Sequence, residues 1–467
     1  MIELFETCPD SIWPGYNLAR EPFIFYVPEQ WALLVNYPTE VPGFNPYPQD
    51  WPKITGNAQI YFGQYKHLAG QLAFMVEVDT IRVAAVPYWE RSAQETYAFI
   101  IHECFHQFQY DNGWKIPWER EEKYHIQDSV NTSLATLELL VLEDALQMAI
   151  EDDKEKCREY IGRFVAVRKA RWSRADEYLR KYERGKELQE GTAHYIENRS
   201  IACIKDLDAE AKFEDSSKYL DLPHLLLKRC QARLTDYAFS PEDMPRNRIY
   251  PVGAVQCYLL DYLGVDWKDR RPDFGESSSY AELFQEELNL DESGFAVLLE
   301  KSKAHYNYSR ILNSASTQIN EYRLGYENEL KDFENSDGYR IEISLNNNGV
   351  SRSRSSSSKK WLMDNGSREL RSHFKIYSLK KDGLVFQAHD CGLMEENDWD
   401  TKRKTVVFYS KAPDSIRLNN KVIALDKLTD RSFANIEMHG QNFDFVYDLS
   451  GTISFAGNHI SIDIYSK

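Results

Sequence analysis

The five residues His102-Glu103-Cys104-Phe105-His106 have the types and spacing of a metal site on a helix. They lie in a stretch (97–109) without Pro or Gly whose apolar residues recur at helical spacing, so we expect a helix here. Residues four apart share a helix face, and the imidazoles of His102 and His106 can therefore bind one ion at about 2.0–2.1 Å. Glu103 lies about 100° around the same helix, where its carboxylate can take a proton from a water that the ion activates.

The third ligand determines the class of such a site. A metzincin has Gly three residues after its second His and another His three residues further on, but this chain has Gln109 and Asn112 there, which excludes that class. Glu190 begins a new helical stretch and is followed by Gly191, which allows another backbone to approach closely. We therefore expect Glu190 to join the two histidines as the third ligand of one Zn²⁺, with one position left open for water.

This arrangement resembles the gluzincin zinc metallopeptidases of the peptidase MA superfamily, whose third ligand typically lies in a Glu-Gly-x-Ala-x-Tyr context on a second helix. Here that context is Glu190-Gly191-Thr192-Ala193-His194-Tyr195. The segment Tyr250-Pro251-Val252-Gly253-Ala254 is similar to the Tyr-x-x-Gly-Ala segment of the aminopeptidase N-like branch. The resemblance covers about residues 70–300.

The resemblance implies a thermolysin-like catalytic domain that acts on a peptide or protein substrate. Tyr250 would stabilise the transition state, and the strand Ile81–Val86 would be an edge strand along which the peptide lies. The interval between His106 and Glu190 is much longer than in the family, so we expect a long helical insertion. The Gly-x-Met-x-Asn motif that grips a substrate amino terminus is missing, so aminopeptidase activity is not implied.

Other residues compete for the third ligand position. Glu138 and Glu143 lie in the apolar helical stretch Leu134–Ile150, where a carboxylate needs a partner. The simpler interpretation, which we favour, is that both face solvent at the edge of the helix. His125 lies close to the position at which short-spaced family members have their Glu and is a weaker alternative.

The neighbouring residues each allow two interpretations. His194, four residues after Glu190, either orients the site or donates a proton to the oxyanion, or else it packs in the core. Tyr250 is either the oxyanion donor or a core aromatic residue. Arg246 and Arg248 can bind a substrate carboxylate or phosphate, but we favour surface salt bridges. Cys104 points away from the metal on a regular helix and is expected to pack.

The surrounding pattern predicts an α+β protein with strands first and helices after. Period-two alternation in 23–35 and 72–87 predicts the early strands, and helical periodicity follows. The expected helices are 92–111, 129–151, 153–184, 187–204, 222–235, 251–264 and 279–300. We expect three parts, namely an N-terminal β-rich part of the catalytic unit (1–90), a helical zinc-binding domain (91–335) and a C-terminal β domain (336–467).

The C-terminal part reads as an all-β sandwich or barrel, because short alternating runs are separated by turn residues. The expected strands are 339–345, 374–379, 384–389, 405–410, 416–425, 443–449, 452–456 and 459–465. Asn346–Ser358 is rich in Asn, Ser and Arg and is expected to be a mobile hairpin tip. This domain is the expected site for substrate recognition or for a protein partner.

The composition excludes several classes of protein. The 467 residues carry a net charge of −17, which argues against nucleic acid as the main partner. No apolar run approaches the roughly 18 residues of a membrane helix, and the first residues lack the pattern of a signal peptide. The seven cysteines are widely spread and never in Cys-x-x-Cys spacing, which indicates reduced thiols in a cytoplasmic protein.

Together these features predict a zinc-dependent metallopeptidase in which Glu103 is the general base and Tyr250 the oxyanion donor. One alternative is a non-catalytic binding or assembly protein on a degenerate gluzincin scaffold, whose fourth coordination position is closed by His194 or another side chain. Another is a gluzincin-type hydrolase of a non-peptide bond.

Overall fold

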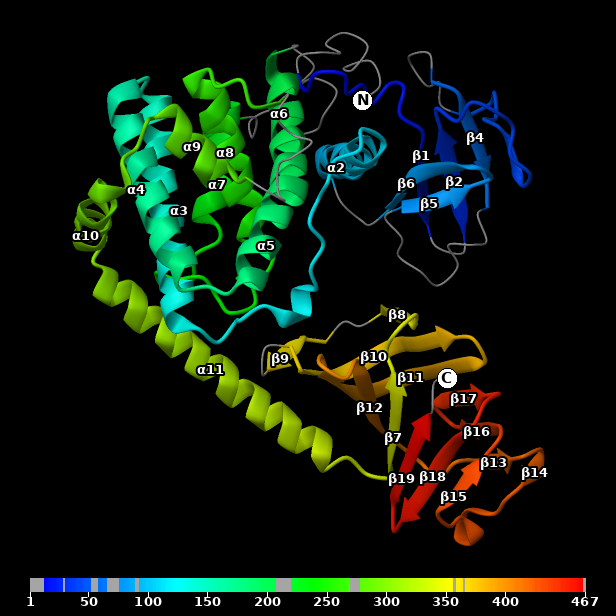
Figure 1. The fold of residues 1–467 in the computed structure, drawn as a ribbon. Coiled ribbons are helices and arrows are strands. Elements are labelled where there is room, and N and C mark those ends of the chain that lie inside the picture. Colours follow the sequence, from blue (N-terminus) through cyan, green and yellow to red (C-terminus); the bar gives the residue numbers. More distant parts are fainter. Residues whose placement is uncertain are drawn as a thin grey trace. The chain divides into compact units, whose positions relative to one another are not determined.

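The computed structural model describes residues 12–27, 30–51, 58–64, 75–88, 92–206, 220–268, 278–355, 358–363 and 366–464. The chain forms two compact units, of which the first comprises Met1–Glu121 with Asp128–Ser316 and the second Glu122–Gln127 with Thr317–Lys467. Strands come first, helices follow, and a large β-sheet ends the chain (Figure 1). The expected α+β class is therefore confirmed.

The first unit begins with a mixed six-stranded sheet in the order β3-β4-β2-β1-β6-β5. Its strands are β1 (Phe23–Val27), β2 (Trp31–Val35), β3 (Phe44–Pro46), β4 (Ile60–Gly63), β5 (Met75–Val78) and β6 (Ile81–Pro87). The period-two pattern correctly predicted strands β1 and β2, but not which of their faces packs in the apolar core. That core contains Ile24, Tyr26, Ala32 and Leu34, whereas Phe25 and Leu33, on the predicted apolar face, are only half-buried.

The prediction that Ile81–Val86 is an edge strand is wrong. β6 pairs with β1 in parallel on one side and with β5 antiparallel on the other, so β5 lies at the edge of the sheet. The cause is local, because Asp79 has a φ of 53° and closes a tight hairpin that folds β5 back onto β6.

Helices make up the rest of the first unit, packed beside one another as Figure 1 shows. They are α2 (Ala93–Asp111), α3 (Ser129–Ile150), α4 (Lys154–Ser173), α5 (Glu177–Lys186), α6 (Thr192–Asp206), α7 (Leu222–Gln231), α8 (Ile249–Leu263), α9 (Tyr280–Glu287) and α10 (Phe295–His305). A further helix, α11 (Tyr308–Glu334), begins in the first unit and belongs mostly to the second. The interval between α2 and α6 is filled by helices, as expected for the long insertion.

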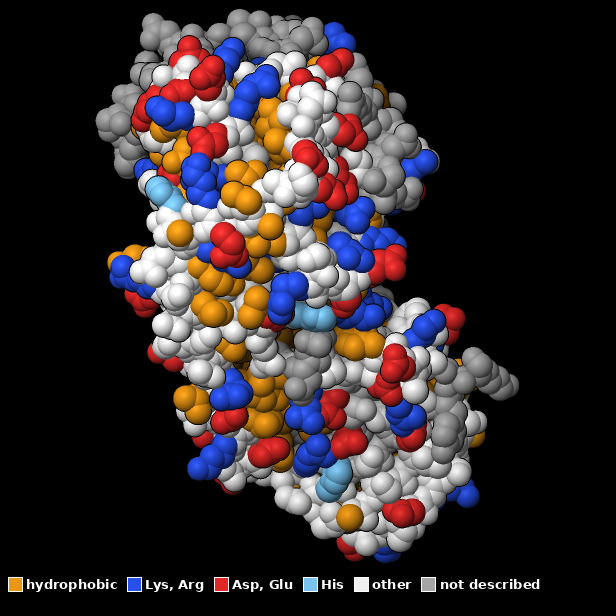
Figure 2. Space-filling view, turned by 60° about the vertical axis from the view of Figure 1, so that its left-hand side comes forward, with side chains coloured by type: hydrophobic (Ala, Val, Ile, Leu, Met, Phe, Trp, Pro, Cys, Tyr) orange, Lys and Arg blue, Asp and Glu red, His pale blue; other side chains and the backbone are white. Residues whose placement is uncertain are grey.

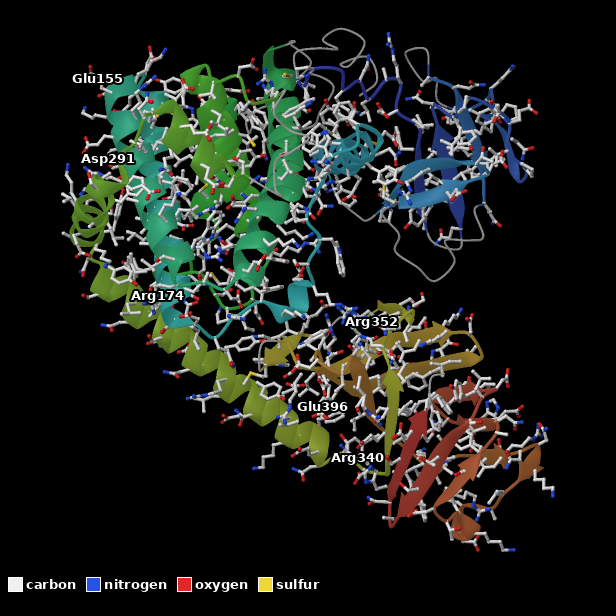
Figure 3. All side chains as sticks on the ribbon, viewed as in Figure 1. Glu155, Arg174, Asp291, Arg340, Arg352 and Glu396 are labelled. Carbon is white, nitrogen blue, oxygen red and sulfur yellow. The ribbon has the colours of Figure 1, made fainter. Side chains whose placement is uncertain are left out.

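Two of the predicted helices are interrupted. The helix expected over 153–184 divides into α4 and α5, because the Asp176 side chain accepts a hydrogen bond from the Leu179 N–H and starts a new helix. The helix expected over 279–300 ends with α9, and Asn289 then has a φ of 50°. Acidic Glu155 and basic Arg174 mark the two ends of α4 in Figure 3, which complements the helix dipole.

The second unit is built around a 13-stranded sheet whose path runs β14-β13-β16-β17-β11-β12-β7-β19-β18-β15, with β10 joining β11 to β8 and β9. Its strands are β7 (Tyr339–Asn346), β8 (Ser351–Ser355), β9 (Trp361–Met363), β10 (Arg368–Lys381), β11 (Leu384–Asp398), β12 (Arg403–Ser410), β13 (Ser415–Leu418), β14 (Lys421–Val422), β15 (Arg431–Phe433), β16 (Ile436–Gly440), β17 (Phe443–Tyr447), β18 (Gly451–Ala456) and β19 (His459–Ile464). The sheet curls around one apolar core.

The predicted mobile hairpin tip at Asn346–Ser358 is wrong for the part of it that forms β8. β8 pairs antiparallel with β10, and Arg352, visible on β8 in Figure 3, forms ion pairs with Glu395 (2.6 Å) and Glu122 (3.0 Å). Glu395 is almost completely buried, so the arginine neutralises a carboxylate inside the unit. The low-complexity composition concealed a strand whose basic side chains each have an acidic partner.

Among the described residues, no helix is both long enough and apolar enough to cross a membrane. Acidic and basic side chains are interspersed on the face shown in Figure 2. Six cysteines lie in the described ranges, and no disulfide joins any two of them.

Candidate metal centre

The helix that carries the His-Glu-x-x-His motif is firmly fixed within the first unit. α2 begins with a capping box in which Ser92 and Glu95 satisfy each other's backbone N–H groups. The Tyr16 hydroxyl donates to the Ile101 carbonyl at 3.1 Å, and the ring of Tyr16 packs edge-on against Phe105 at 5.2 Å. One side of α2 is thus anchored in an aromatic core. His102 and His106 lie on another side of the helix, where both contact Glu190.

Glu190 lies in a π-helical turn, Glu187–Gly191, between α5 and α6. Such turns are rare and occur frequently at functional sites, because the extra residue re-aims a side chain. Glu190 is 5% exposed. The next residue, Gly191, touches α8, since a Cβ placed on Gly191 would lie 2.6 Å from the Cα of Gly253. The close backbone approach expected at the Glu-Gly pair is therefore present.

The three predicted metal ligands converge on one point. His102 Nε2 lies 3.1 Å from His106 Nε2, and Glu190 Oε2 lies 3.4 Å from the first and 3.3 Å from the second. Donor atoms about 2.0–2.1 Å from a tetrahedral ion are separated by about 3.3–3.4 Å. The residues therefore fit a zinc ion, and they form one of the two groups among the described residues that could hold a metal.

The electrostatics of this point favour positive charge. Burial lowers the pKa of His102, but the carboxylates of Glu190 and Glu197 outweigh burial and raise it to about 10. Burial also raises the pKa of Glu190, yet His106 and His102 hold that pKa well below its usual range. A location that stabilises a protonated imidazole and an ionised carboxylate is suited to a cation.

Gln109 orients His106 and ties it to the π turn. The Gln109 side-chain oxygen lies 2.9 Å from His106 Nδ1, and its amide nitrogen donates to the carbonyls of Leu188 (3.3 Å) and Gln189 (3.0 Å). With Nδ1–H donating to Gln109, Nε2 of His106 keeps its lone pair for a metal. Sequence reasoning used Gln109 only to exclude the metzincins and missed this function.

Glu197 lies in a comparable position beside His102, although its contact with Nδ1 is an ion pair and not a hydrogen bond. One of its oxygens lies 3.3 Å from His102 Nδ1 and 3.0 Å from His194 Nδ1. Burial raises the pKa of Glu197, but the two histidines lower it far more, so the carboxylate stays ionised. His102, His194 and Glu197 form the second metal-capable group. The spacing of Glu197 carries a signal for this position, because Glu197 follows Glu190 by two helical turns.

His194 is 5% exposed, and its Nε2 atom has no hydrogen-bond partner among the described residues. Burial lowers the pKa of His194, which favours the neutral imidazole. His194 and His102 thus share Glu197 as a neighbour. His194 is not one of the three residues whose donor atoms converge on the metal point.

Glu103 and Tyr250 border the same point. Glu103 is 7% exposed, and burial raises its pKa above the usual value, with a further contribution from Glu190. The Tyr250 ring stacks on His102 at 5.8 Å with an interplanar angle of 12°, and its hydroxyl accepts from Arg246 Nε at 2.9 Å. Burial, and then the charge of Glu190, raises the pKa of Tyr250, so the hydroxyl keeps its proton and can donate it.

The rival ligands lie elsewhere. Neither metal-capable group includes His125, Glu138 or Glu143. The expectation that Glu138 faces solvent is wrong, because it is fully buried and pairs with Arg168 (2.9 Å) and Arg171 (2.7 Å). Glu143 is half-buried, and burial raises its pKa to about 7.

The surface salt bridge expected for Arg248 is also wrong. Arg248 is fully buried and pairs with Glu183 on α5. It belongs to a buried ionic cluster in which each charge has an opposite partner. The cluster consists of Glu138, Arg168, Arg171, Glu183, Glu187 and Arg248. Since Glu187 begins the π turn and Arg248 precedes α8, the cluster links the two elements that carry Glu190 and Tyr250. Cys104 is buried, as expected.

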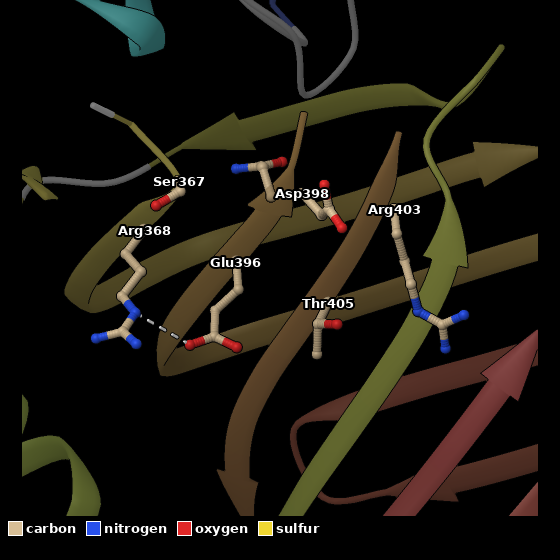
Figure 4. Close-up of a pocket in the computed structure, with 7 residues that line it drawn as sticks. Ser367, Arg368, Glu396, Asp398, Arg403 and Thr405 are labelled. Atoms are coloured by element: carbon tan, nitrogen blue, oxygen red, sulfur yellow. Dashed lines mark ion pairs between the residues drawn. The ribbon is translucent and has the colours of Figure 1, made fainter. Parts of the chain in front are cut away.

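The second unit contains a hollow of about 270 Å³ lined by Ser367, Arg368, Glu396, Asn397, Asp398, Arg403 and Thr405. Figure 4 shows Arg368 and Glu396 turned toward each other, with Nε and Oε1 3.4 Å apart. Arg403 pairs with Asp463 at 2.6 Å. The two arginines that line the hollow thus each have a carboxylate partner, and the hollow has none of the convergent donor geometry of the metal centre.

Comparison of the chain with protein-family models, with curated proteins and with solved structures found no match.

Proposed function

We propose that this chain is a zinc-dependent hydrolase, and specifically a metallopeptidase that cleaves a peptide or protein substrate. One observation carries the proposal: Nε2 of His102, Nε2 of His106 and Oε2 of Glu190 lie 3.1–3.4 Å from one another, the spacing that a tetrahedral zinc requires. The general base of the motif, Glu103, is present beside them.

The three ligands leave a coordination position for water. Among the described residues, the group around this point contains only two imidazoles and one carboxylate. Catalytic zinc sites have three protein ligands and an open fourth position, whereas structural sites are closed. This supports hydrolysis over the alternative of a binding protein whose metal is structural.

Each neighbouring residue has a defined role in the proposed reaction. Zinc, when bound, would lower the pKa of a coordinated water and polarise the substrate carbonyl. Glu103 takes the proton of the attacking water and delivers it to the leaving amine, and its raised pKa suits both steps. The Tyr250 hydroxyl donates a hydrogen bond to the oxyanion that develops on the carbonyl.

The cysteines support a reducing compartment for this activity. No disulfide joins any two of the six that lie in the described ranges, which agrees with the cytoplasmic location that we propose.

Metal analysis combined with a peptide library tests the proposal. The wild type should contain one zinc per chain, and His106→Ala and Glu190→Ala should lose it. Glu143→Gln, which removes a carboxylate outside the site, should keep it. Glu103→Gln should keep zinc but lose at least about 100-fold in turnover. A protein without zinc, or zinc-bound protein that cleaves no peptide, would contradict the peptidase proposal.

A further inference from the structure

Two basic residues border the metal centre, and neither belongs to the catalytic residues described above. Lys186 ends α5, and its Nζ lies 3.3 Å from Glu190 Oε1. Glu190 therefore directs one oxygen at the histidines and the other at a lysine. Arg246 is exposed and reaches the Tyr250 hydroxyl through Nε alone.

Most of the N–H donors of the Arg246 guanidinium are not used in hydrogen bonds to described residues. Arginine carries five N–H groups, and the only one that is used here binds the Tyr250 hydroxyl, since none of the described residues accepts from Nη1 or Nη2. An exposed arginine on a protein with a net charge of −17 has many acidic residues available as partners. Its terminal nitrogens are instead left open beside the hydroxyl that would bind the reacting carbonyl.

The charges around the metal centre also favour an anionic group on the substrate. The acidic groups closest to the metal point, Glu103 and Glu190, would be matched by the charge of a zinc ion alone. Lys186 and Arg246 add two positive charges, of which the charge of Glu121 near Arg246 offsets one. The third carboxylate, Glu197, already has Arg229 at 4.0 Å. An occupied site is thus positive overall, which attracts an anionic group on the substrate.

We propose that Arg246, assisted by Lys186, binds a substrate carboxylate next to the bond that is cleaved, so that the enzyme selects acidic peptides. The planar guanidinium fork matches a carboxylate, and a charge-assisted pair of this kind contributes more than a neutral hydrogen bond. The inference rests on the proposed peptidase function. The carboxylate belongs either to an Asp or Glu side chain or to a free carboxyl terminus, and the experiment separates these two sources.

Binding is measured by calorimetry on zinc-loaded Glu103→Gln protein, which holds peptides without cleaving them. Three peptides are compared: acetyl-Ala-Ala-Asp-Ala-Ala-amide, acetyl-Ala-Ala-Asn-Ala-Ala with a free carboxyl terminus, and acetyl-Ala-Ala-Asn-Ala-Ala-amide. One of the two acidic peptides should bind about 10-fold or more tightly than the neutral one. The better acidic peptide identifies the source of the carboxylate.

Adding Arg246→Gln should abolish this preference, and adding Arg246→Lys should keep part of it. Arg158→Gln is the matched control, because it removes an exposed arginine from α4. In the catalytic wild-type background, loss of anion binding raises KM for the acidic peptide alone, whereas disturbance of Tyr250 lowers kcat for acidic and neutral peptides alike.

Equal binding of all three peptides, no binding of any, or a preference that survives Arg246→Gln would each overturn the inference. Peptide turnover by the zinc-loaded wild type distinguishes failure of this inference from failure of the proposed peptidase function. Cleavage without a carboxylate preference leaves the peptidase proposal standing and removes only the role of Arg246.

Discussion

Gly191 and Gly253 bring the π turn and α8 into backbone contact. A Cβ on Gly191 would lie 2.6 Å from Gly253 Cα, and a Cβ on Gly253 would lie 2.7 Å from Gly191 Cα. The first glycine directly follows the proposed ligand Glu190, and the second lies one helical turn after Tyr250. The pair therefore sets the separation between a metal ligand and the proposed oxyanion donor.

Replacing Gly191 by Ala should damage both stability and the site. The added methyl group would overlap backbone atoms of α8, which cannot move aside as a flexible side chain can, so α8 must shift. We expect the free energy of unfolding to fall by about 1–3 kcal/mol. Chemical denaturation measures the loss, and competition with a chelator should show weaker zinc binding. Gly294→Ala is the control, because its Cβ meets open space and its φ is −83°. Equal effects of the two substitutions would contradict the assigned role.

The buried ionic cluster should be sensitive to the loss of one charge. Glu183 accepts from Arg171 and Arg248 inside the first unit, and Glu183→Gln would leave the two guanidinium groups short of a negative charge. Removing one partner of a buried ion pair typically costs about 3–5 kcal/mol, so the free energy of unfolding should fall by that amount. Lys303→Gln, the control, breaks an exposed ion pair with Glu300. This substitution should change the free energy of unfolding by less than about 0.5 kcal/mol.

Glu143 should make the first unit less stable as the pH rises. Its Oε1 is buried without a hydrogen-bond partner in the described part of the chain, and burial raises its pKa from 4.5 to about 7. Between these two values the folded state retains a proton that the unfolded state releases, so stability falls as the pH increases through this window and stays reduced above it. Below about pH 4.5 both states are protonated and the effect vanishes.

Glu143→Gln removes this dependence. The variant should have a higher Tm than the wild type at pH 8 and nearly the same Tm at pH 4.5, when melting is followed by circular dichroism. Glu300→Gln, at an exposed position, should leave the pH profile of Tm unchanged. A Tm difference that is the same at both pH values would show that the carboxyl group does not titrate as the structure indicates.

The sequence was sufficient to predict that His102, His106 and Glu190 lie together. His102 and His106 are placed by helical geometry alone, and Glu190 by its position before a glycine at which two backbones meet. The same holds for the strands with clear period-two alternation, such as β1 and β2. In these cases the sequence pattern that permits the prediction lies within one helix or strand, or in one glycine that permits close backbone contact.

Features that depend on a partner distant in the sequence were missed. Arg248 and Glu138 looked like surface charges, because composition does not show that another helix supplies the opposite charge in the interior. The edge position of β6 was expected from the family resemblance alone, and the neighbouring strand β5, folded back at Asp79, takes that position instead. The Ser/Arg run of β8 was read as a mobile tip, although Arg352 has carboxylates from β11 and from the segment before α3.

Glu197 provides the sharpest test of how the metal centre is organised. A single carboxylate oxygen lies within 3.3 Å of Nδ1 of both His102 and His194. Carboxylates that fix the tautomer of a metal-binding histidine typically contribute 10–100-fold to metal affinity. Glu197→Gln should therefore weaken zinc binding about 10-fold or more in a competition titration with a chelator, while the wild-type fold is retained in circular dichroism.

The outcome for His194 distinguishes two arrangements of the same residues. If Glu197 serves only to orient His102, then His194→Gln should leave zinc affinity nearly unchanged, because His194 is absent from the group that converges on the metal point. If zinc instead occupies the second group, formed by His102, His194 and Glu197, then His194→Gln should abolish zinc binding and His106→Ala should preserve it. Since the spacing of 3.1–3.4 Å in the first group matches tetrahedral zinc, we expect His106→Ala to lose the metal and His194→Gln to keep it.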